Sequence, residues 1–260
     1  MFTASAKGGF FYSMNQLVTI TTDFGDGFAT SQLEAVVARL GFEGKLIENH
    51  DVKPFSIVEG AYGIWQLAKF CPAGTVHVGV VDPGVGSERA GIIVRSEKYW
   101  FVGPDNGLLW PALRFTPGEY SAHSRCVGAW RLNEKWFGEV ANTFHGRDVF
   151  IKAAVKLAQG ERPENFGCKP NGEIVKLEFA EGQVVHIDHY GNAKIWGEKT
   201  FGLPVVETFS DVPEGDALML NGSSGLLELA INCGNAAETF GLKLGQVIND
   251  LRIKKNLSAD

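Results

Sequence analysis

The segment VHVGVVDPGVGSER, residues 76–89, places an acid and a base on either side of a glycine-rich turn. Asp82 follows an apolar run typical of a buried strand, and Arg89 comes after the turn Pro-Gly-Val-Gly-Ser and Glu88. A carboxylate held beside a guanidinium can accept a hydrogen bond from a water molecule and orient it for attack. The structural alternative is that Asp82 only begins the turn, because Asp is a common turn residue.

A second candidate for proton chemistry is His145, in the segment NTFHGRDVF (142–150). Histidine can accept or relay a proton near neutral pH. The structural alternative is a histidine at a helix start, beside a local ion pair of Arg147 and Asp148. The functional hypothesis is that His145 joins Asp82 and Arg89 around one water molecule.

The elements that would position these residues alternate between strand and helix patterns. Strands are expected at 16–25, 45–50, 75–81, 91–96 and 99–104, and helices at 31–40, 56–70 and 147–160. This alternation predicts an N-terminal α/β domain with a parallel sheet and right-handed crossovers. The polar loops 21–28, 81–89 and 103–107 would then share the carboxyl edge of the sheet, where ligands usually bind.

The pattern changes after residue 160, where Pro and Gly become frequent and short strand-like runs follow. We therefore expect two domains: 15–163 as the α/β domain and 173–256 as a smaller β domain, a sandwich or barrel. Residues 164–172 would form the linker between them. Residues 1–14 lack the long apolar core of a secretory signal and are expected to be a flexible leader.

Composition narrows the class of protein. The net charge of -6 argues against nucleic acid or an anionic membrane as partner, and no apolar run is long enough to cross a bilayer. The 260 residues are 45% hydrophobic and 21% charged, as in ordinary globular proteins. Four cysteines without CxxC spacing indicate separate reduced thiols. We expect a cytoplasmic protein.

Several familiar motifs are absent or incomplete. The Asp-Phe-Gly triplet at 23–25 has no accompanying HRD motif, and neither a GxxxxGK[ST] loop nor a GxSxG elbow occurs. His186 and His189 have metal-ligand types, but on a strand their spacing faces them oppositely, and no third ligand suggests itself. The sequence therefore predicts no kinase, no phosphate loop, no serine nucleophile and no metal.

A set of motifs in fixed order is more specific than its parts. The chain carries, in order, TITTDFGDGF, HVGVVDPGVGSER, FVGPDNGL, TFHGRDVF, IDHYGNAKI and GSSGLLELAINCGNAA. Together, from about Thr19 to Val247, they resemble the S-adenosyl-L-methionine (SAM) hydrolases, or SAM hydroxide adenosyltransferases. That family also contains the fluorinase and the chlorinase.

The resemblance implies a fold, an activity and an assembly. It implies an N-terminal α/β domain followed by a β-barrel-like domain, and a homotrimer that binds SAM between domains of neighbouring subunits. The implied reaction splits SAM with water into adenosine and L-methionine, without a cofactor. The catalytic Asp, Arg and His of the hydrolase branch fall on Asp82, Arg89 and His145.

Two substrate-binding positions of the first domain carry over by the same resemblance. Asp23 matches the acid that binds the ribose hydroxyls, and Phe55 matches an aromatic residue packed on the sugar and methionine side. In the fluorinase the positions of Asp82, Val85 and Gly146 hold a tyrosine, a threonine and a serine. Because this chain offers no hydroxyl at those positions, the resemblance favours water over halide as nucleophile.

The second domain supplies the remaining implied contacts. Tyr190 matches the ring that stacks on adenine, Asn192 the amide that pairs with adenine, and Asp188 the acid that receives the methionine ammonium. Ser223 and Ser224 fall where the halogenases hold the carboxylate with a serine and an arginine, so Ser224 departs from that pattern. Independently of the resemblance, Tyr190 and Asn192 also suit an ordinary turn at Tyr-Gly-Asn.

Two other functions stay open at this point. A chlorinase-like halogenase would make 5′-chloro-5′-deoxyadenosine from the same substrate. A sensor that binds SAM or adenosine without turnover would have no need of the Asp82, Arg89 and His145 set. That set therefore favours the hydrolase.

Overall fold

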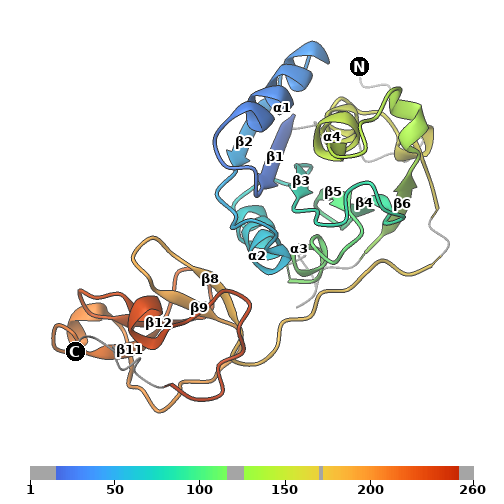
Figure 1. The fold of residues 1–260 in the computed structure, drawn as a ribbon. Coiled ribbons are helices and arrows are strands. Elements are labelled where there is room, and N and C mark those ends of the chain that lie inside the picture. Colours follow the sequence, from blue (N-terminus) through green and yellow to red (C-terminus); the bar gives the residue numbers. More distant parts are fainter. Residues whose placement is uncertain (1–15, 116–125, 170–171, 252–260) are drawn as a thin grey trace, which may run out of the picture.

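The computed structural model describes residues 16–115, 126–169 and 172–251; the expected leader 1–14 lies outside them. The chain forms two units, each built on its own β-sheet (Figure 1). The first unit contains a seven-stranded sheet. Its strands are β1 (Leu17–Thr22), β2 (Lys45–Asn49), β3 (Val76–Val80), β4 (Gly91–Arg95), β5 (Trp100–Pro104), β6 (Gly128–Leu132) and β7 (Gly167–Cys168).

The first sheet is mixed, which corrects the expectation of a parallel sheet. Its strand order is β2-β1-β3-β5-β4-β6-β7, and only β2, β1, β3 and β5 run parallel. β4 pairs antiparallel with β5 and with β6, and β6 with β7. The reason is the short link between β4 and β5, because a parallel pair needs a crossover of a dozen or more residues. The four parallel strands hold the loops that carry chemistry.

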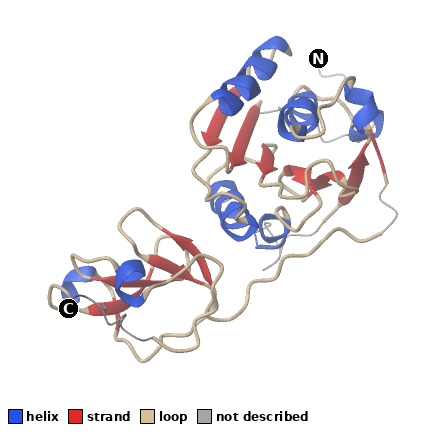
Figure 2. Cartoon of the chain, in the orientation of Figure 1, coloured by secondary structure: helices blue, strands red, loops and turns tan. Residues whose placement is uncertain are grey.

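Helices cover both faces of the first sheet, as Figure 2 shows. On one face, α1 (Phe28–Arg39) and α4 (Ile151–Ala158) bury apolar residues against β1, β3 and β5. On the other face lie α2 (Ile57–Ala68) and α3 (Trp110–Phe115). Ser56 caps α2 by accepting a hydrogen bond from the Glu59 amide, as its residue type predicts. An apolar layer on each face of the first sheet therefore fixes the strands whose carboxyl ends carry the polar loops.

The second unit is built mainly of strands and turns. Its five strands are β8 (Val184–Ile187), β9 (Ala193–Ile195), β10 (Val205–Val206), β11 (Ala217–Asn221) and β12 (Leu227–Ile231). They are ordered β10-β11-β12-β9-β8, and α5 (Ala236–Phe240) follows β12. Only the β10–β11 pair is parallel. Over the described residues β10 does not pair with β8, so closure into a barrel stays a prediction.

The second unit rests on α2 of the first. Val185, Leu226 and Phe179 are buried in the same apolar cluster as the inner face of α2. Beside them the ring of His186 stacks on that of Tyr62, with ring centroids 5.0 Å apart. The two units are therefore joined by a continuous core.

The segment 164–172, expected to be a linker, is partly structured. The segment begins within the short 3₁₀ turn η3 (Pro163–Asn165). It also contains β7, whose residues pair with Arg131 and Leu132 of β6. The first sheet thus continues into the segment expected to be a linker. The glycine and proline content that indicated a linker also suits a short edge strand between turns.

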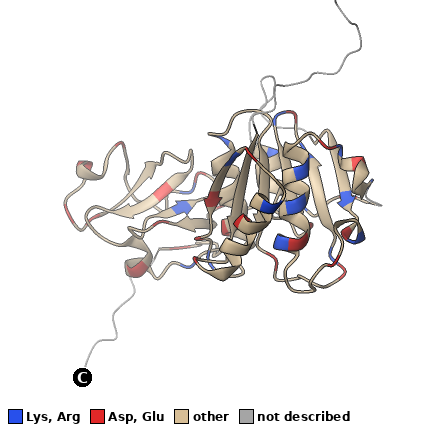
Figure 3. Ribbon diagram, turned by 90° about the horizontal axis from the view of Figure 1, so that it is seen from above, with Lys and Arg blue, Asp and Glu red and all other residues tan. Residues whose placement is uncertain are grey.

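The distribution of charged residues and the length of the helices show whether the protein has a basic face or a membrane-spanning helix. In Figure 3, basic and acidic segments lie close to one another rather than forming one basic face. None of the helices in the described part of the chain is both long and apolar enough to span a membrane.

Candidate active site

Asp82, Arg89 and His145 come together at the end of β3. Arg89 donates from Nε to both carboxylate oxygens of Asp82, each at 2.9 Å, and from Nη2 to Asp82 Oδ2. The same Nη2 lies 2.9 Å from Nδ1 of His145. All three side chains are nearly buried. The structure therefore assembles the three residues predicted from the sequence, although their catalytic roles stay a prediction.

The loop between Asp82 and Arg89 is a sequence of tight turns. The amide of Val85 donates to the Asp82 carbonyl at 3.1 Å, and that of Ser87 to the Gly84 carbonyl at 3.1 Å. Gly86 has a φ of 77°, and a Cβ there would lie 2.5 Å from the carbonyl oxygen of Asn142. Glycine is required at that position for both reasons. The turn brings Arg89 back onto Asp82.

His145 precedes a π-helical turn, η2 (Gly146–Phe150), that leads into α4. Arg147 donates to Asp148 from Nε at 2.7 Å, so the expected local ion pair is present. Asp148 also accepts from the amide of Ala141 at 2.9 Å and thereby fixes the chain before His145. Burial would raise the pKa of Asp148, but the hydrogen bonds from Arg147 and Ala141 outweigh it and lower that pKa. His145 itself reaches Arg89, outside this pair.

Asp82 and His145 line a cavity of about 240 Å³, hereafter the β3 cavity. This volume is below the roughly 300–1,000 Å³ usual for small-molecule pockets, so the cavity suits part of a ligand. Val85 and Gly146 also line it, and neither brings a hydroxyl to the cavity. Its walls are completed by Asp23, Phe24, Pro54, Phe55, Val80, Thr143 and Phe144.

The two other first-domain residues predicted to bind substrate lie together in this cavity. Asp23 accepts a hydrogen bond from the Phe55 amide at 2.8 Å. Phe55 has a φ of 65°, unusual for a residue with a side chain, and 74% of its surface is exposed. The Asp23 contact therefore fixes the backbone of Phe55, whose exposed side chain lines the β3 cavity.

Tyr190 and Asn192 line a different hollow, on the second unit, of about 660 Å³; we call it the Tyr190 hollow. Tyr190 is 74% exposed, whereas Asn192 is buried. Its other lining residues are Phe209, Ile231, Cys233, Gly234 and Asn235. Within one chain, no residue lines both this hollow and the β3 cavity.

Asp188 shapes the turn that carries these two residues. Its Oδ1 accepts from the amides of Tyr190 and Asn192, each at 3.0 Å, and its Oδ2 from Lys194 Nζ at 3.0 Å. Burial would raise the pKa of Asp188, but the hydrogen bonds from Lys194 and Asn192 outweigh it and lower that pKa. Lys194 Nζ also pairs with the buried Glu228 at 2.6 Å. Asp188 already has an ammonium partner within its own chain.

Ser223 and Ser224 line neither the β3 cavity nor the Tyr190 hollow. Ser224 is buried, and its carbonyl accepts from Lys69 Nζ of the first unit at 2.6 Å. Its hydroxyl accepts from the Leu226 amide at 3.3 Å. In one chain Ser224 thus belongs to the contact between the units, whereas Ser223 is exposed.

The other acidic loop at the sheet edge has a structural partner. Asp105, just after β5, accepts from the Val175 amide at 2.8 Å and so anchors the segment that leads to the second sheet. Burial raises the pKa of Asp105. Asp105 does not line the β3 cavity, so only two of the three polar loops expected at this edge contribute to it.

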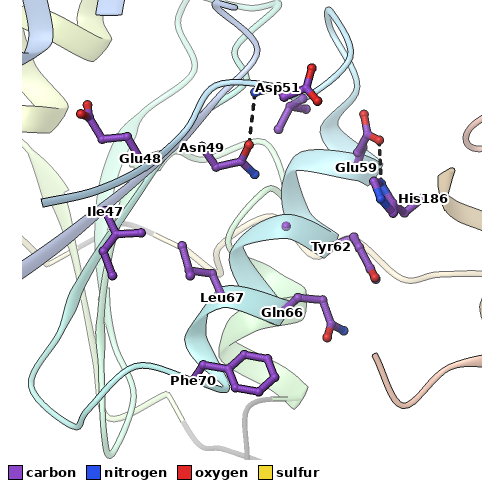
Figure 4. Close-up of a pocket in the computed structure, with 12 residues that line it drawn as sticks. Ile47, Glu48, Asn49, Asp51, Glu59, Tyr62, Gln66, Leu67, Phe70 and His186 are labelled. Carbon is purple, nitrogen blue, oxygen red and sulfur yellow. Dashed lines mark hydrogen bonds and ion pairs between the residues drawn. The ribbon is translucent and has the colours of Figure 1, made fainter. Parts of the chain in front are cut away.

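His186, one of the two histidines of HIDH, is also used structurally. Its Nδ1 lies 2.8 Å from the buried carboxylate of Glu59, beside a pocket of about 410 Å³ on α2 and β2 (Figure 4). None of the residues predicted to bind substrate lines that pocket. Across the described ranges, no group of three or more His, Cys, Asp or Glu residues is placed to hold a metal ion.

Sequence reasoning missed one charged neighbour of the predicted catalytic set. Glu134, which begins the 3₁₀ turn η1 (Glu134–Phe137) after β6, has its Oε1 3.5 Å from His145 Nδ1. The same oxygen lies 4.0 Å from Arg89 Nη1. Nothing in the local sequence points to it, because only the tertiary fold brings β6 beside the β3 loop.

Two family models match this chain. The SAM hydroxide adenosyltransferase N-terminal domain matches residues 18–167, and the C-terminal domain of the same name matches residues 193–249. The matched residues lie in the two sheet units described above. The chain belongs to the SAM hydroxide adenosyltransferase family.

Named relatives agree with this assignment. The (R)-S-adenosyl-L-methionine hydrolase of Thermus thermophilus is 34% identical over 76% of this chain and 84% of its own length. The hydrolase of the same name from Salinispora tropica is 33% identical over 88% and 95%. Fluorinases are more distant, at 24% to 27% identity.

A solved structure shares the fold. The crystal structure of a conserved hypothetical protein from Thermus thermophilus superimposes with a TM-score of 0.72 at 32% identity. The match covers 88% of this chain and 96% of that one.

Proposed function

We propose that this protein hydrolyses S-adenosyl-L-methionine at the ribose C5′ carbon, giving adenosine and L-methionine. The observation that carries the proposal is the contact of Asp82, Arg89 and His145, of which Asp82 and His145 line the β3 cavity. The names of the relatives support it, and they specify the (R) form of the substrate. Asp82 and His145 supply polar groups to a cavity otherwise walled largely by apolar and aromatic side chains.

The proposed reaction is an in-line displacement. The water oxygen bonds to C5′ while the C5′–S bond breaks. The electron pair of the C5′–S bond stays on sulfur, so methionine leaves as a neutral thioether. No general acid is needed for this leaving group. Asp82 accepts a hydrogen bond from the water, Arg89 fixes Asp82, and Asp82 or His145 takes the proton. Holding water and C5′ in attack geometry contributes on the order of 7–11 kcal/mol.

Because the sulfonium is already a good leaving group, we propose that no cofactor takes part. The partners are then SAM, adenosine and methionine, and neither nucleic acid nor a membrane has a role. We propose that the protein is cytoplasmic, because its proposed substrate SAM is present in that compartment.

Two subunits are proposed to share each site, within a homotrimer. In this arrangement Tyr190 and Asn192 of one subunit hold the adenine, while Asp23 and Phe55 of its neighbour hold the ribose beside Asp82. Two facts support it: the β3 cavity alone is small, and the exposed rings of Phe55 and Tyr190 lie on different units. Ser223, Ser224 and Asp188 would face the methionine end of the substrate.

Mixing two inactive variants tests the shared site. We expect Asp82→Asn and Tyr190→Ala to be nearly inactive alone at limiting SAM, because each removes a different half of the site. After mixed subunits are allowed to exchange, some interfaces combine an intact β3 cavity with an intact Tyr190 hollow. Adenosine formation should then recover to a measurable fraction of wild type. An exchanged mixture that stays as inactive as its components would contradict a shared site.

A halogenase is the main rival, and product analysis separates it from a hydrolase. With SAM and excess chloride, the hydrolase makes adenosine, whereas a chlorinase makes 5′-chloro-5′-deoxyadenosine. The apolar Val85 and Gly146 in the β3 cavity favour adenosine. Tight SAM binding with neither product after long incubation would instead identify a sensor and overturn the proposed activity.

A further inference from the structure

Glu134 lies beside the predicted catalytic set without belonging to it. Its side chain is 37% exposed, whereas those of Arg89 and His145 are 10% and 6% exposed. Its Oε1 is 3.5 Å from His145 Nδ1 and 4.0 Å from Arg89 Nη1. One carboxylate oxygen therefore faces two groups of the set from the solvent side.

Arg89 has an unused donor on that side. Its Nε and Nη2 are engaged by Asp82, and Nη2 also reaches His145. Nη1 is buried and has no hydrogen-bond partner among the described residues. An enclosed guanidinium N–H without an acceptor is costly, and a shift of Glu134 by about 1 Å would satisfy it.

The two neighbours of His145 Nδ1 require opposite proton positions. A guanidinium can only donate, so a hydrogen bond from Arg89 needs a lone pair on Nδ1 and leaves the proton of the neutral ring on Nε2. A carboxylate can only accept, so a hydrogen bond to Glu134 needs the proton on Nδ1. Only the second arrangement leaves a lone pair on Nε2.

Nε2 is the ring nitrogen free to meet a water. Within the described part of the chain, the hydrogen bond of the His145 ring to Arg89 and its contact with Glu134 both involve Nδ1. The ring lines the β3 cavity together with Asp82. Both oxygens of Asp82 already accept from Arg89, which leaves His145 as the less occupied acceptor.

We propose that Glu134 is a positioning residue: its carboxylate closes on Nδ1 in place of the Arg89 contact and holds the proton of His145 there, so that Nε2 accepts the proton of the attacking water. As the oxygen bonds to C5′ and the C5′–S electrons pass to sulfur, the proton moves to Nε2. The resulting imidazolium is stabilised by the Glu134 carboxylate. This inference rests on the proposed hydrolysis and chooses between the two proton acceptors left open there.

The test combines steady-state kinetics with the ¹⁵N NMR spectrum of the His145 ring, recorded at a pH where the ring is neutral. The His145 signals are assigned as those that disappear in His145→Gln. In wild type we expect the proton on Nδ1. In Glu134→Ala it should move to Nε2, and kcat should fall about 10- to 100-fold, as when a histidine loses its outer hydrogen-bond partner. KM should stay within about 2-fold, because Glu134 does not line the β3 cavity.

Two further variants sharpen the result. Glu134→Gln keeps an acceptor oxygen but no charge, so it should keep the proton on Nδ1 and lose less kcat than Glu134→Ala. Glu139→Ala removes an exposed carboxylate five positions along the same segment and should change neither readout. Unchanged kcat in Glu134→Ala, or a lowered kcat with the proton still on Nδ1, would overturn the proposal. Because the spectrum needs no turnover, it decides the inference even if SAM hydrolysis itself were disproved.

Discussion

Replacing Asp82 by Asn is expected to abolish most adenosine formation while SAM still binds. The loss in kcat should be about 10²- to 10⁴-fold, the usual contribution of a positioned group in acid–base catalysis, because Asp82 orients the water and holds Arg89. In the structure both carboxylate oxygens accept from Arg89. An amide keeps one acceptor oxygen, turns the other position into a donor facing Arg89, and carries no charge. The water would lose its acceptor and Arg89 its partner.

Single-turnover kinetics with saturating SAM, together with a direct binding measurement, check this prediction. Asp216→Asn is the matched control, because that carboxylate is exposed on the second unit. It should behave as wild type in both measurements. If Asp82→Asn turned over SAM at the wild-type rate with an intact fold, the role assigned to Asp82 would be wrong.

The buried His77 is expected to make the fold acid-sensitive. His77 lies on β3, fully buried, with Nδ1 2.8 Å from the Thr19 hydroxyl and its ring stacked on Phe101. Burial lowers the pKa of His77 from 6.5 to about 3. Between pH 6.5 and about pH 3, His77 is therefore protonated in the unfolded chain but stays neutral in the folded chain. Stability from the neutral ring is complete above pH 6.5 and is lost as the pH falls toward 3.

Denaturant unfolding of wild type and His77→Phe at several pH values measures this effect. Between pH 6.5 and pH 4, wild type should lose about 3 kcal/mol more than the variant, at roughly 1.4 kcal/mol per pH unit. At pH 7 the variant should be less stable by about 1–3 kcal/mol, because the Thr19 hydroxyl loses its partner. Equal losses on acidification in both proteins would show that His77 does not stay neutral in the folded state.

The sequence was most informative where local pattern and tertiary structure agree. The apolar run ending at Val81 forms β3, and the glycine turn after it returns Arg89 to Asp82. His145 is 56 residues from Arg89 in the sequence. Its place beside Arg89 was predicted from the ordered set of motifs that resembles the family, and not from the sequence spacing of the two residues. The parallel strands β1, β2, β3 and β5 match the predicted alternation.

The remaining features depend on contacts between distant segments. β4 runs antiparallel because its link to β5 is short, which the strand pattern alone does not reveal. Glu134 gains its place only when β6 pairs with β4. Ser224 and Asp188 have residue types suited to a ligand, yet Lys69 and Lys194 are their partners within the chain. A residue's type limits what it can bind, and the fold decides what lies within its reach.

Hydrolysis in ¹⁸O-labelled water tests the central claim most directly. Attack by water at C5′ forms the new C–O bond on the adenosine side. We therefore expect one labelled oxygen in the 5′-hydroxyl of adenosine and none in methionine, measured by mass spectrometry after incubation with SAM. Adenosine without the label, or label in methionine alone, would contradict displacement by water at C5′.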